Sequence, residues 1–246
     1  MNTAFRPALG AAVIAACTLA TASFAASADT LTNFSNPAPI TIGADPSTPY
    51  PSPIAVTGLR GNVVAVNVTL NNVSHAFPQD IDVLLVGPQG QQVILMADAG
   101  AGTDVSNLTL TLSASATATL PTPLVSGTWL PTDREDGDGN DVFPAPAPAG
   151  VRGTDLRVFN GPASTQNGGW RLFVRDDYPI ADAGSFASGW TLSITTAFAS
   201  CADEGFTGNK LTLCRRVCEV DNSPSTLTSL IKLYTAIYRE APPCAL

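Results

Sequence analysis

Two short segments in the second half of the chain carry the pattern that most constrains the fold. Each begins with a Gly-Trp dipeptide and continues with an apolar residue at every second position. A period of two places these apolar side chains on one face of a β-strand, and the acidic, glycine-containing stretch between the segments is typical of a loop. The apolar positions are Trp170, Leu172 and Val174 in the first strand and Trp190, Leu192 and Ile194 in the second.

Other segments with a two-residue period lie on the N-terminal side of these two. The expected strands are residues 39–42, 64–70, 80–86, 92–96, 108–112 and 156–159. Residues 120–153 are rich in Pro, Gly and acidic residues, and we expect a long loop there because proline cannot donate a hydrogen bond to a β-ladder. No helical spacers separate the strands, which excludes a parallel α/β sheet. The pattern therefore predicts an all-β fold, an antiparallel β-sandwich of jelly-roll type.

The N-terminal end of the chain differs from this strand-rich part. Residues 1–28 combine Arg6, an apolar run and small residues at the expected cleavage site, as in a secretory signal peptide. Cys17 also fits a bacterial lipoprotein box, but the apolar run continues past it, so we favour the ordinary signal. A Pro- and Ser-rich lead with the first strand follows at residues 29–53, and the jelly roll at residues 54–198. We therefore expect a secreted or periplasmic protein without a transmembrane span.

Residues 199–246 form a cysteine-rich tail with one expected helix. Ser223 followed by Pro224 is typical of an N-cap with proline at the first helical position, and we interpret the helix as a disulfide-locked cap rather than an interaction module. An even number of cysteines in an exported chain favours two disulfides with three possible connectivities, and a zinc site is the less favoured alternative. The four cysteines are Cys201, Cys214, Cys218 and Cys244.

The charge balance excludes one class of partner. The net charge is −8, and residues 29–200 contain fifteen acidic side chains against six basic ones. An electrostatic field of this sign disfavours nucleic acid and anionic lipid, and it favours cations. We therefore expect no binding of nucleic acid.

Three groups of acidic residues are candidate ligands for Ca²⁺. Residues 133–141 place oxygen ligands at alternate positions among glycines, which suits a hard cation, with a solvated acidic loop as the alternative. A second group lies on the strand at residues 80–86, where two carboxylates are expected on one face, about 7 Å apart. The third lies in the loop between the Gly-Trp strands. The candidate ligands are Asp80, Asp82, Asp136, Asp138, Asn140, Asp176, Asp177 and Asp182.

Trp129 is the candidate for an exposed aromatic side chain, whereas the other two tryptophans lie on the apolar register of their strands and are expected in the core. Trp129 is flanked by Gly127 and Pro131 beside the long loop. Sugars stack on such rings, and jelly rolls often bind carbohydrate, although this is an analogy at the level of the fold. Trp129 therefore supports an alternative function, a Ca²⁺-dependent carbohydrate- or surface-binding module.

Several motifs occur in a fixed order along the chain: Asn-Val-Ser-His at residues 72–75, Asp-Ile-Asp-Val-Leu-Leu-Val at residues 80–86, a Gly-Pro-x-Gly turn, and the two Gly-Trp strands. Their order and spacing resemble the P domain (P/Homo B domain) of subtilisin-like proprotein convertases, in the form found in secreted bacterial proteins, with Gly-Pro where the family has Ser-Pro. The resemblance covers about residues 40–196. It implies structural Ca²⁺ held by aspartates of the loops.

In convertases the P domain follows a catalytic domain and helps to stabilise it. Here the motifs follow the expected signal almost directly, and His75 is the only histidine. A Ser-His-Asp enzyme needs its base beside a nucleophile, and no Gly-x-Ser-x-Gly motif occurs. We expect His75 to hydrogen-bond at a strand end and the chain to have no catalytic residues. The resemblance implies a stabilising or docking module in extracellular proteolysis, with a secreted subtilisin-like protease as partner; a cell-surface glycan is the partner in the alternative.

Overall fold

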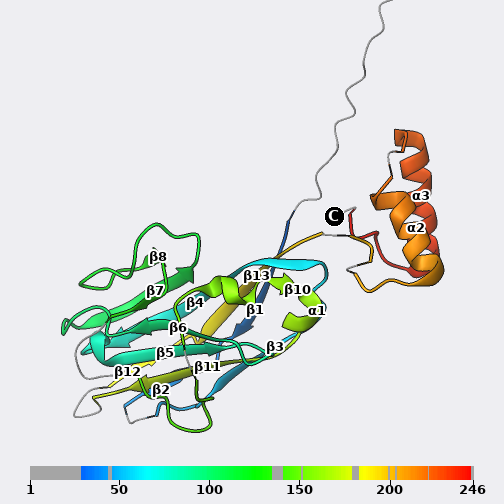
Figure 1. Ribbon diagram of the computed structural model, residues 1–246. Coiled ribbons are helices and arrows are strands. Elements are labelled where there is room, and N and C mark those ends of the chain that lie inside the picture. Colours follow the sequence, from blue (N-terminus) through cyan, green and yellow to red (C-terminus); the bar gives the residue numbers. More distant parts are fainter. Residues whose placement is uncertain are drawn as a thin grey trace, which may run out of the picture.

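The computed structural model describes residues 29–43, 46–134, 141–150, 152–178, 183–198, 200–202, 204–220 and 222–244. Within them, two β-sheets pack face to face, and a pair of helices lies beyond one end of the sandwich (Figure 1). The chain is an all-β sandwich with a cysteine-rich helical tail, as the alternating pattern predicts. The expected signal peptide, including Cys17, lies outside the described residues.

The larger sheet is built around one long strand, which has partners along both of its sides. Its path is β1-β13-β4-β12-β2, with β7 and β10 also pairing β4, and β8 pairing β7. The strands are β1 (Thr30–Asn36), β2 (Ile40–Ile42), β4 (Asn62–His75), β7 (Val105–Ser113), β8 (Gly127–Trp129), β10 (Gly161–Pro162), β12 (Gly184–Phe186) and β13 (Trp190–Ala197).

The smaller sheet has the order β3-β11-β5-β6-β9. Its strands are β3 (Ser52–Val56), β5 (Ile81–Val86), β6 (Gln92–Ala97), β9 (Thr132–Asp133) and β11 (Gly168–Asp176). Most pairs in both sheets are antiparallel, as expected, but the short strands β8 and β9 run parallel to β7 and β6. Both lie in the stretch that we expected to be loop throughout.

The two Gly-Trp strands lie in different sheets and do not pair with each other. Trp170 in β11 and Trp190 in β13 are both fully buried, which confirms their expected place in the core. Each indole N–H has a partner: Trp170 donates to the carbonyl oxygen of Gln166, and Trp190 donates to Ser52 Oγ, both at 3.0 Å. Each sheet therefore contributes one large, fully buried aromatic side chain to the core between them.

The glycine before the second tryptophan is required by a close approach of the backbone. Gly189 has a φ of 61°, and a Cβ atom at this position would lie 2.0 Å from the carbonyl oxygen of Asn36. Only glycine fits such a contact without displacing the chain. The Gly-Trp motif thus combines a tight turn with a core anchor.

A β-bulge interrupts the expected inward register of β4. Val64 is 41% exposed, whereas Val63 is buried. The pairing with β13 shifts between Thr195 and Thr196 at this point, and the extra residue turns the side chains over by one position. Val64 starts the two-residue apolar period of the expected strand 64–70, but it faces away from the core.

The lead at residues 29–53 belongs to the sandwich. It supplies β1, which pairs with β13, and β3, which pairs with β11 and crosses the expected boundary between residues 53 and 54. Residues 156–159, expected as a strand, instead form the 3₁₀ helix η2 (Leu156–Phe159) before the short helix α1 (Ala163–Gln166). The two apolar residues at its ends are both buried, because a spacing of three places them on the same side of a 3₁₀ helix.

The tail consists of the helices α2 (Gly208–Cys218) and α3 (Pro224–Tyr238). The Ser223 side chain accepts a hydrogen bond from the amide of Thr226, which confirms the expected N-cap; α2 was not predicted. Disulfides join Cys201 to Cys214 and Cys218 to Cys244, which selects one of the three connectivities.

None of the helices in the described part of the chain has the length and apolarity needed to cross a membrane.

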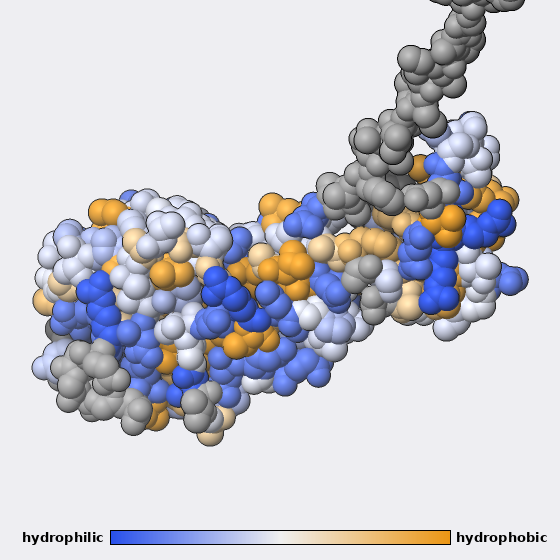
Figure 2. All heavy atoms as spheres, turned by 45° about the horizontal axis from the view of Figure 1, so that its top comes forward, coloured by the Kyte–Doolittle hydropathy of each residue, from blue (hydrophilic) through white to orange (hydrophobic). Residues whose placement is uncertain are grey.

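A narrow junction joins the tail to the sandwich (Figure 2). Glu240 of the tail accepts a hydrogen bond of 2.9 Å from Arg60, in the turn before β4, and forms an ion pair of 2.7 Å with Lys210 of α2. These two cations lower the pKa of Glu240 to about 2. A cavity of about 290 Å³ lies at the same junction, lined by residues of both parts, among them Phe198 and Pro242.

Candidate functional site

His75, the only histidine of the chain, ends β4 and lies in a fully buried pair with Asp176, which ends β11. The two side chains approach to 3.3 Å between Nε2 and Oδ2. The Nδ1 atom lies 2.9 Å from the carbonyl oxygen of Phe77 and 3.2 Å from its amide nitrogen. Both ring nitrogens therefore face fixed partners, which confirms the expected hydrogen bonding at a strand end, and the pair links the two sheets.

The space around this pair is closed. Gly184 of β12 lies opposite His75 in the sheet, and a Cβ atom on it would lie 2.2 Å from the Cδ2 atom of the imidazole. The Asp176 carboxylate also accepts a hydrogen bond from the amide of Tyr178. The described residues therefore close the His75 side chain off from solvent.

Three aspartates from different elements bring their carboxylates together at the same end of the smaller sheet. Asp98 follows β6 directly, Asp133 lies in β9 opposite Ala97 of β6, and Asp141 starts the described segment 141–150. The three residues each offer a carboxylate oxygen within 4.8 Å of the other two. Ca²⁺ holds oxygen ligands at about 2.4 Å, so ligand oxygens on opposite sides of one ion are about 5 Å apart. One cation can therefore contact all three carboxylates.

Asp82 is buried in the sheet beside this cluster. It is the second residue of β5 and lies opposite Arg175 of β11. It shares the outer face of the sheet with Leu84 and Val86, and its exposed fraction is 0%. Neither carboxylate oxygen accepts a hydrogen bond from the described residues, and the Arg175 guanidinium approaches no closer than 3.9 Å. A buried carboxyl group without a hydrogen bond is uncommon and points to a ligand or a water at this place.

Asp82 interacts electrostatically with two carboxylates of the cluster, Asp98 and Asp141. Burial is the largest cause that raises the pKa of Asp82, to about 9, followed by the charges of Asp141, Asp177 and Asp98; Arg175 opposes these effects. The raised pKa keeps Asp82 neutral among the other carboxylates. A divalent cation bound here would lower this pKa, because the cation stabilises every ionised carboxylate around it. The donor set of oxygen atoms fits a hard cation such as Ca²⁺.

A proline-rich segment packs as a cover on the apolar outer face of the smaller sheet. Phe143 is buried in the same apolar cluster as Phe173 of β11. Arg152 lies 5.1 Å from the centre of the Phe143 ring and donates a hydrogen bond to the carbonyl oxygen of Asp141. The cover therefore also holds Asp141 in the acidic cluster.

The structure separates the predicted ligands. Asp80 and Asp82 do not share a strand face, contrary to expectation, because Asp80 ends the 3₁₀ helix η1 (Pro78–Asp80) and β5 begins one residue later. Asp176 faces the histidine between the sheets, while Asp177 acts on Asp82 through its charge. The remaining candidates lie outside the described residues: Asp136, Asp138, Asn140 and Asp182.

Asp98 is the residue that sequence reasoning missed. It stands alone in the sequence Met-Ala-Asp-Ala-Gly, without the spacing that marks a ligand run. Asp133 and Asp141, in contrast, are the two ends of the predicted acidic run. The parallel pairing of β9 with β6 brings Asp133 beside Asp98, and the hydrogen bond from Arg152 holds the backbone of Asp141.

Trp129 is half-buried in β8 and packs against the main core. Its indole N–H donates to the carbonyl oxygen of Val125 at 3.2 Å. A Cβ atom on Gly127 would lie 2.9 Å from the indole ring, so that glycine makes room for the ring. Trp129 is therefore a packed side chain on an edge strand, with its polar atom engaged.

Comparison with known proteins gives little similarity. No family model and no curated protein matches the chain. Among solved structures, the serine protease of Aeromonas sobria in complex with its chaperone ORF2 aligns with a TM-score of 0.31 and 14% identity, over 70% of this chain and 27% of that chain. A structure of the serine protease of Aeromonas sobria aligns with a TM-score of 0.27 and 13% identity, over 69% and 26%. The chain spans about a quarter of the length of these proteins, and a likeness at this level assigns it no activity.

Proposed function

We propose that this chain is a non-catalytic, cation-stabilised β-sandwich of the P-domain type, which acts as a stabilising or docking module for a subtilisin-like protease outside the cytoplasm. The buried His75–Asp176 pair carries this proposal. His75 lies in the Asn-Val-Ser-His motif and Asp176 ends the first Gly-Trp strand, both within the stretch that resembles a P domain, and the pair connects the two sheets. The two disulfides suit an oxidising compartment, which supports export.

The geometry of His75 supports a role without catalysis. A general base must reach both its nucleophile and the substrate. Here Nε2 faces Asp176, Nδ1 faces the backbone of Phe77, and the side chain is fully buried. Since the chain contains no second histidine, a triad of the Ser-His-Asp type has no base to use.

Ca²⁺ is the cation that the donor set supports best. The proposed ligands are Asp98, Asp133 and Asp141, with Asp82 as the buried fourth carboxylate. Bound Ca²⁺ would neutralise repulsion among these groups and fix β5, β6, β9 and the cover to one another. A module of this kind gains stability wherever Ca²⁺ is abundant, as it is outside cells.

The carbohydrate-binding alternative has no observation of its own in its favour. Trp129 packs on the core and its N–H is engaged, whereas a sugar platform needs an open ring face. We therefore retain the protease-associated function alone.

The link to proteolysis is tested with a secreted subtilisin-like protease of the same organism. The half-life of its peptidase activity at elevated temperature is measured with and without an equimolar amount of the purified chain. We expect a half-life several-fold longer with the chain, and no such gain with a Trp170→Ala variant, whose core is disrupted. An unchanged half-life with the intact chain would refute the stabilising role.

The absence of catalysis is tested on the chain alone. Fluorescent casein is incubated with wild type and with His75→Gln, and we expect neither sample to exceed the buffer control. Cleavage by wild type that disappears in His75→Gln would contradict the proposal.

The cation site is tested by thermal denaturation in Ca²⁺ and in EDTA. We expect Ca²⁺ to raise the midpoint of wild type and to have a much smaller effect on Asp82→Asn. Asp104→Asn is the matched control because Asp104 is exposed and outside the cluster. Equal midpoints for wild type in Ca²⁺ and EDTA would eliminate the site while leaving the proposed partner untouched.

A further inference from the structure

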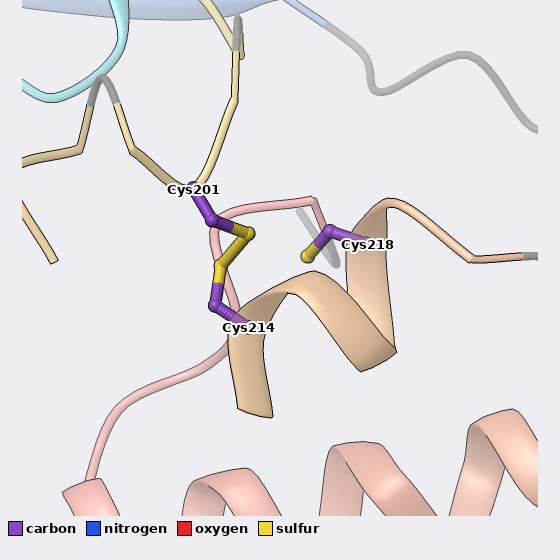
Figure 3. Close-up of side chains that lie close together, drawn as sticks. All are labelled: Cys201, Cys214 and Cys218. Atoms are coloured by element: carbon purple, nitrogen blue, oxygen red, sulfur yellow. A yellow bond between two sulfur atoms is a disulfide. The ribbon is translucent and has the colours of Figure 1, made fainter. Parts of the chain in front are cut away.

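The tail holds sulfur atoms from two different disulfides close together. The sulfur of Cys218, which is bonded to Cys244, lies within 4.8 Å of both sulfurs of the Cys201–Cys214 bridge. Figure 3 shows the Cys218 sulfur turned toward that bridge from the C-terminal end of α2. Among the described residues, Cys244 is not part of this close group. Cys218 is therefore the one cysteine placed to exchange with a second disulfide.

The two disulfides differ in their access to solvent. Cys201 and Cys214 are fully buried in the small core of the tail, whereas Cys218 and Cys244 are half-buried. Thiol–disulfide exchange depends on access of the attacking thiolate to a sulfur atom. A thiol from solution therefore reaches the Cys218–Cys244 bridge first.

We propose that the tail is a thiol–disulfide exchange centre for small-molecule thiols, with Cys218 as the residue that passes the exchange to the buried bridge. A thiolate from solution attacks the sulfur of Cys244, forms a mixed disulfide with it, and releases Cys218 as a thiolate. The Cys218 thiolate then attacks the sulfur of Cys201, forms the Cys201–Cys218 disulfide, and releases Cys214 as a thiolate that takes a proton from water. Each step replaces one S–S bond by another, so no oxidant or reductant beyond the external thiol is needed.

The geometry of α2 favours Cys201 as the point of attack. Cys214 and Cys218 are four residues apart on one helix, where Cβ atoms are separated by about 5–6 Å. A disulfide joins Cβ atoms about 3.8 Å apart, so a bridge between these two residues would deform the helix. Cys201 precedes α2 in a loop and can adjust. The exchange therefore keeps α2 tied to the segment after β13, frees Cys214, and leaves Cys244 bonded to the external thiol.

The inference is independent of the proposed function, because it concerns only the four cysteines. It gives the tail two covalent states. In one, both ends of the tail are bridged; in the other, the C-terminal segment that carries Glu240 loses its disulfide anchor and keeps noncovalent contacts, among them those of Glu240 with Arg60 and Lys210.

The test compares Cys244→Ser with Cys218→Ser, both in the chain without the expected signal peptide (residues 29–246), which lacks Cys17, and both purified in the oxidised state. Each variant leaves one free thiol and an intact Cys201–Cys214 bridge, but only Cys244→Ser leaves that thiol on Cys218. The proteins are alkylated with iodoacetamide under native conditions, denatured and digested with trypsin. The basic residues of the tail place each cysteine on a separate tryptic peptide, so mass spectrometry identifies every pair.

We expect Cys244→Ser to contain the Cys201–Cys218 pair together with alkylated Cys214. Cys218→Ser should contain only the Cys201–Cys214 pair and alkylated Cys244. The exchanged product should exceed any exchanged product of Cys218→Ser on the order of tenfold or more, because neighbouring groups react far faster than distant ones. A Cys244→Ser protein with only the original bridge and alkylated Cys218 would overturn the proposal.

The wild-type chain provides the same readout if Cys244→Ser does not accumulate as folded protein. It is treated with reduced glutathione, and samples are alkylated at intervals. We expect glutathione on Cys244 together with the Cys201–Cys218 pair. Glutathione on Cys244 without that pair at any time, or no reaction at the half-buried bridge, would each count against the exchange centre.

Discussion

The sandwich and the tail are held together in different ways. Residues 29–198 contain no cysteine, and the two sheets enclose a large apolar core centred on Trp170 and Trp190. The tail has two short helices around a small core that includes Tyr234, and all four of its cysteines form disulfides. Short helices are marginal in water, and small units bury too little apolar surface to be stable without cross-links. The comparison teaches that core size decides where covalent bridges are needed.

The two parts also differ in charge. The acidic excess of the chain lies in residues 29–200, where fifteen acidic side chains face six basic ones, whereas residues 201–246 carry five of each. A response to cations should therefore be confined to the sandwich, and a response to thiols to the tail. The predictions below test this separation.

The largest effect is expected from the sandwich core. Trp170→Ala should destabilise the sandwich by about 3–5 kcal/mol, because it removes a fully buried aromatic side chain and leaves a cavity. Unfolding in guanidinium chloride, followed by tryptophan fluorescence, measures the change. Tyr234→Ala in the tail is the matched control, and it should leave the midpoint of the sandwich unfolding transition unchanged. Equal losses in both variants would mean that the two parts unfold as one unit.

Removal of the buried disulfide should affect the tail instead. The Cys201–Cys214 bridge closes a loop with a sequence separation of 13, which corresponds to about 3 kcal/mol of stabilisation. The double variant Cys201→Ser/Cys214→Ser should lose helical ellipticity at 222 nm while the sandwich transition keeps its midpoint. A large fall in the sandwich midpoint would contradict the comparison.

The next prediction concerns Asp82 in the absence of a cation. Its pKa is raised to about 9 in the folded chain and is about 3.9 in an unfolded chain. Between these values the folded state holds one more proton, so stability falls as pH rises, by at most about 1.4 kcal/mol per pH unit. Burial is the main cause of this raised pKa; the charges of Asp141, Asp177 and Asp98 raise it further, and Arg175 opposes them.

Urea denaturation in EDTA at about pH 5 and pH 8 measures this slope. Wild type should lose more stability than Asp82→Asn between the two conditions, and saturating Ca²⁺ should remove the difference. Identical pH dependence of the two proteins in EDTA would show that Asp82 is not held protonated.

The smallest effect is expected at the junction. Glu240→Gln removes the ion pairs with Arg60 and Lys210, which are partly exposed, so the loss should be about 0.5–1 kcal/mol. Because the pKa of Glu240 is lowered to about 2, this contribution is present near neutral pH and is lost as pH falls toward 2. Hydrogen exchange of α3 measures it; unchanged protection in Glu240→Gln would show that the disulfides alone hold the tail.

Much of the fold could be predicted because its main strands alternate apolar and polar residues. β1 was missed since its sequence, Thr-Leu-Thr-Asn-Phe-Ser-Asn, has apolar side chains three positions apart, as suits a half-exposed edge strand that buries little on either face. η2 was misread because two apolar ends of a four-residue segment fit a strand as readily as a 3₁₀ turn. Local patterns cannot distinguish such short elements.

The candidate site was only partly predictable. Asp82 was selected from its place on an apolar strand, and the two ends of the predicted acidic run at residues 133–141 lie in the carboxylate cluster. Asp98 carried no signal, because its role depends on the parallel pairing of β9 with β6, a contact between distant segments. The connectivity of the disulfides likewise depends on how α2 packs against α3, a helix pair of which only one member was predicted.

The central claim is that Asp82, buried and protonated, belongs to a cation site. Isothermal titration of Ca²⁺ into the metal-free chain at about pH 7, repeated in buffers of different ionisation enthalpy, counts the protons released on binding. With the pKa of Asp82 raised to about 9, binding should release about one proton per ion in wild type and close to none in Asp82→Asn. Absence of binding, or binding with equal proton release in both proteins, would contradict the account.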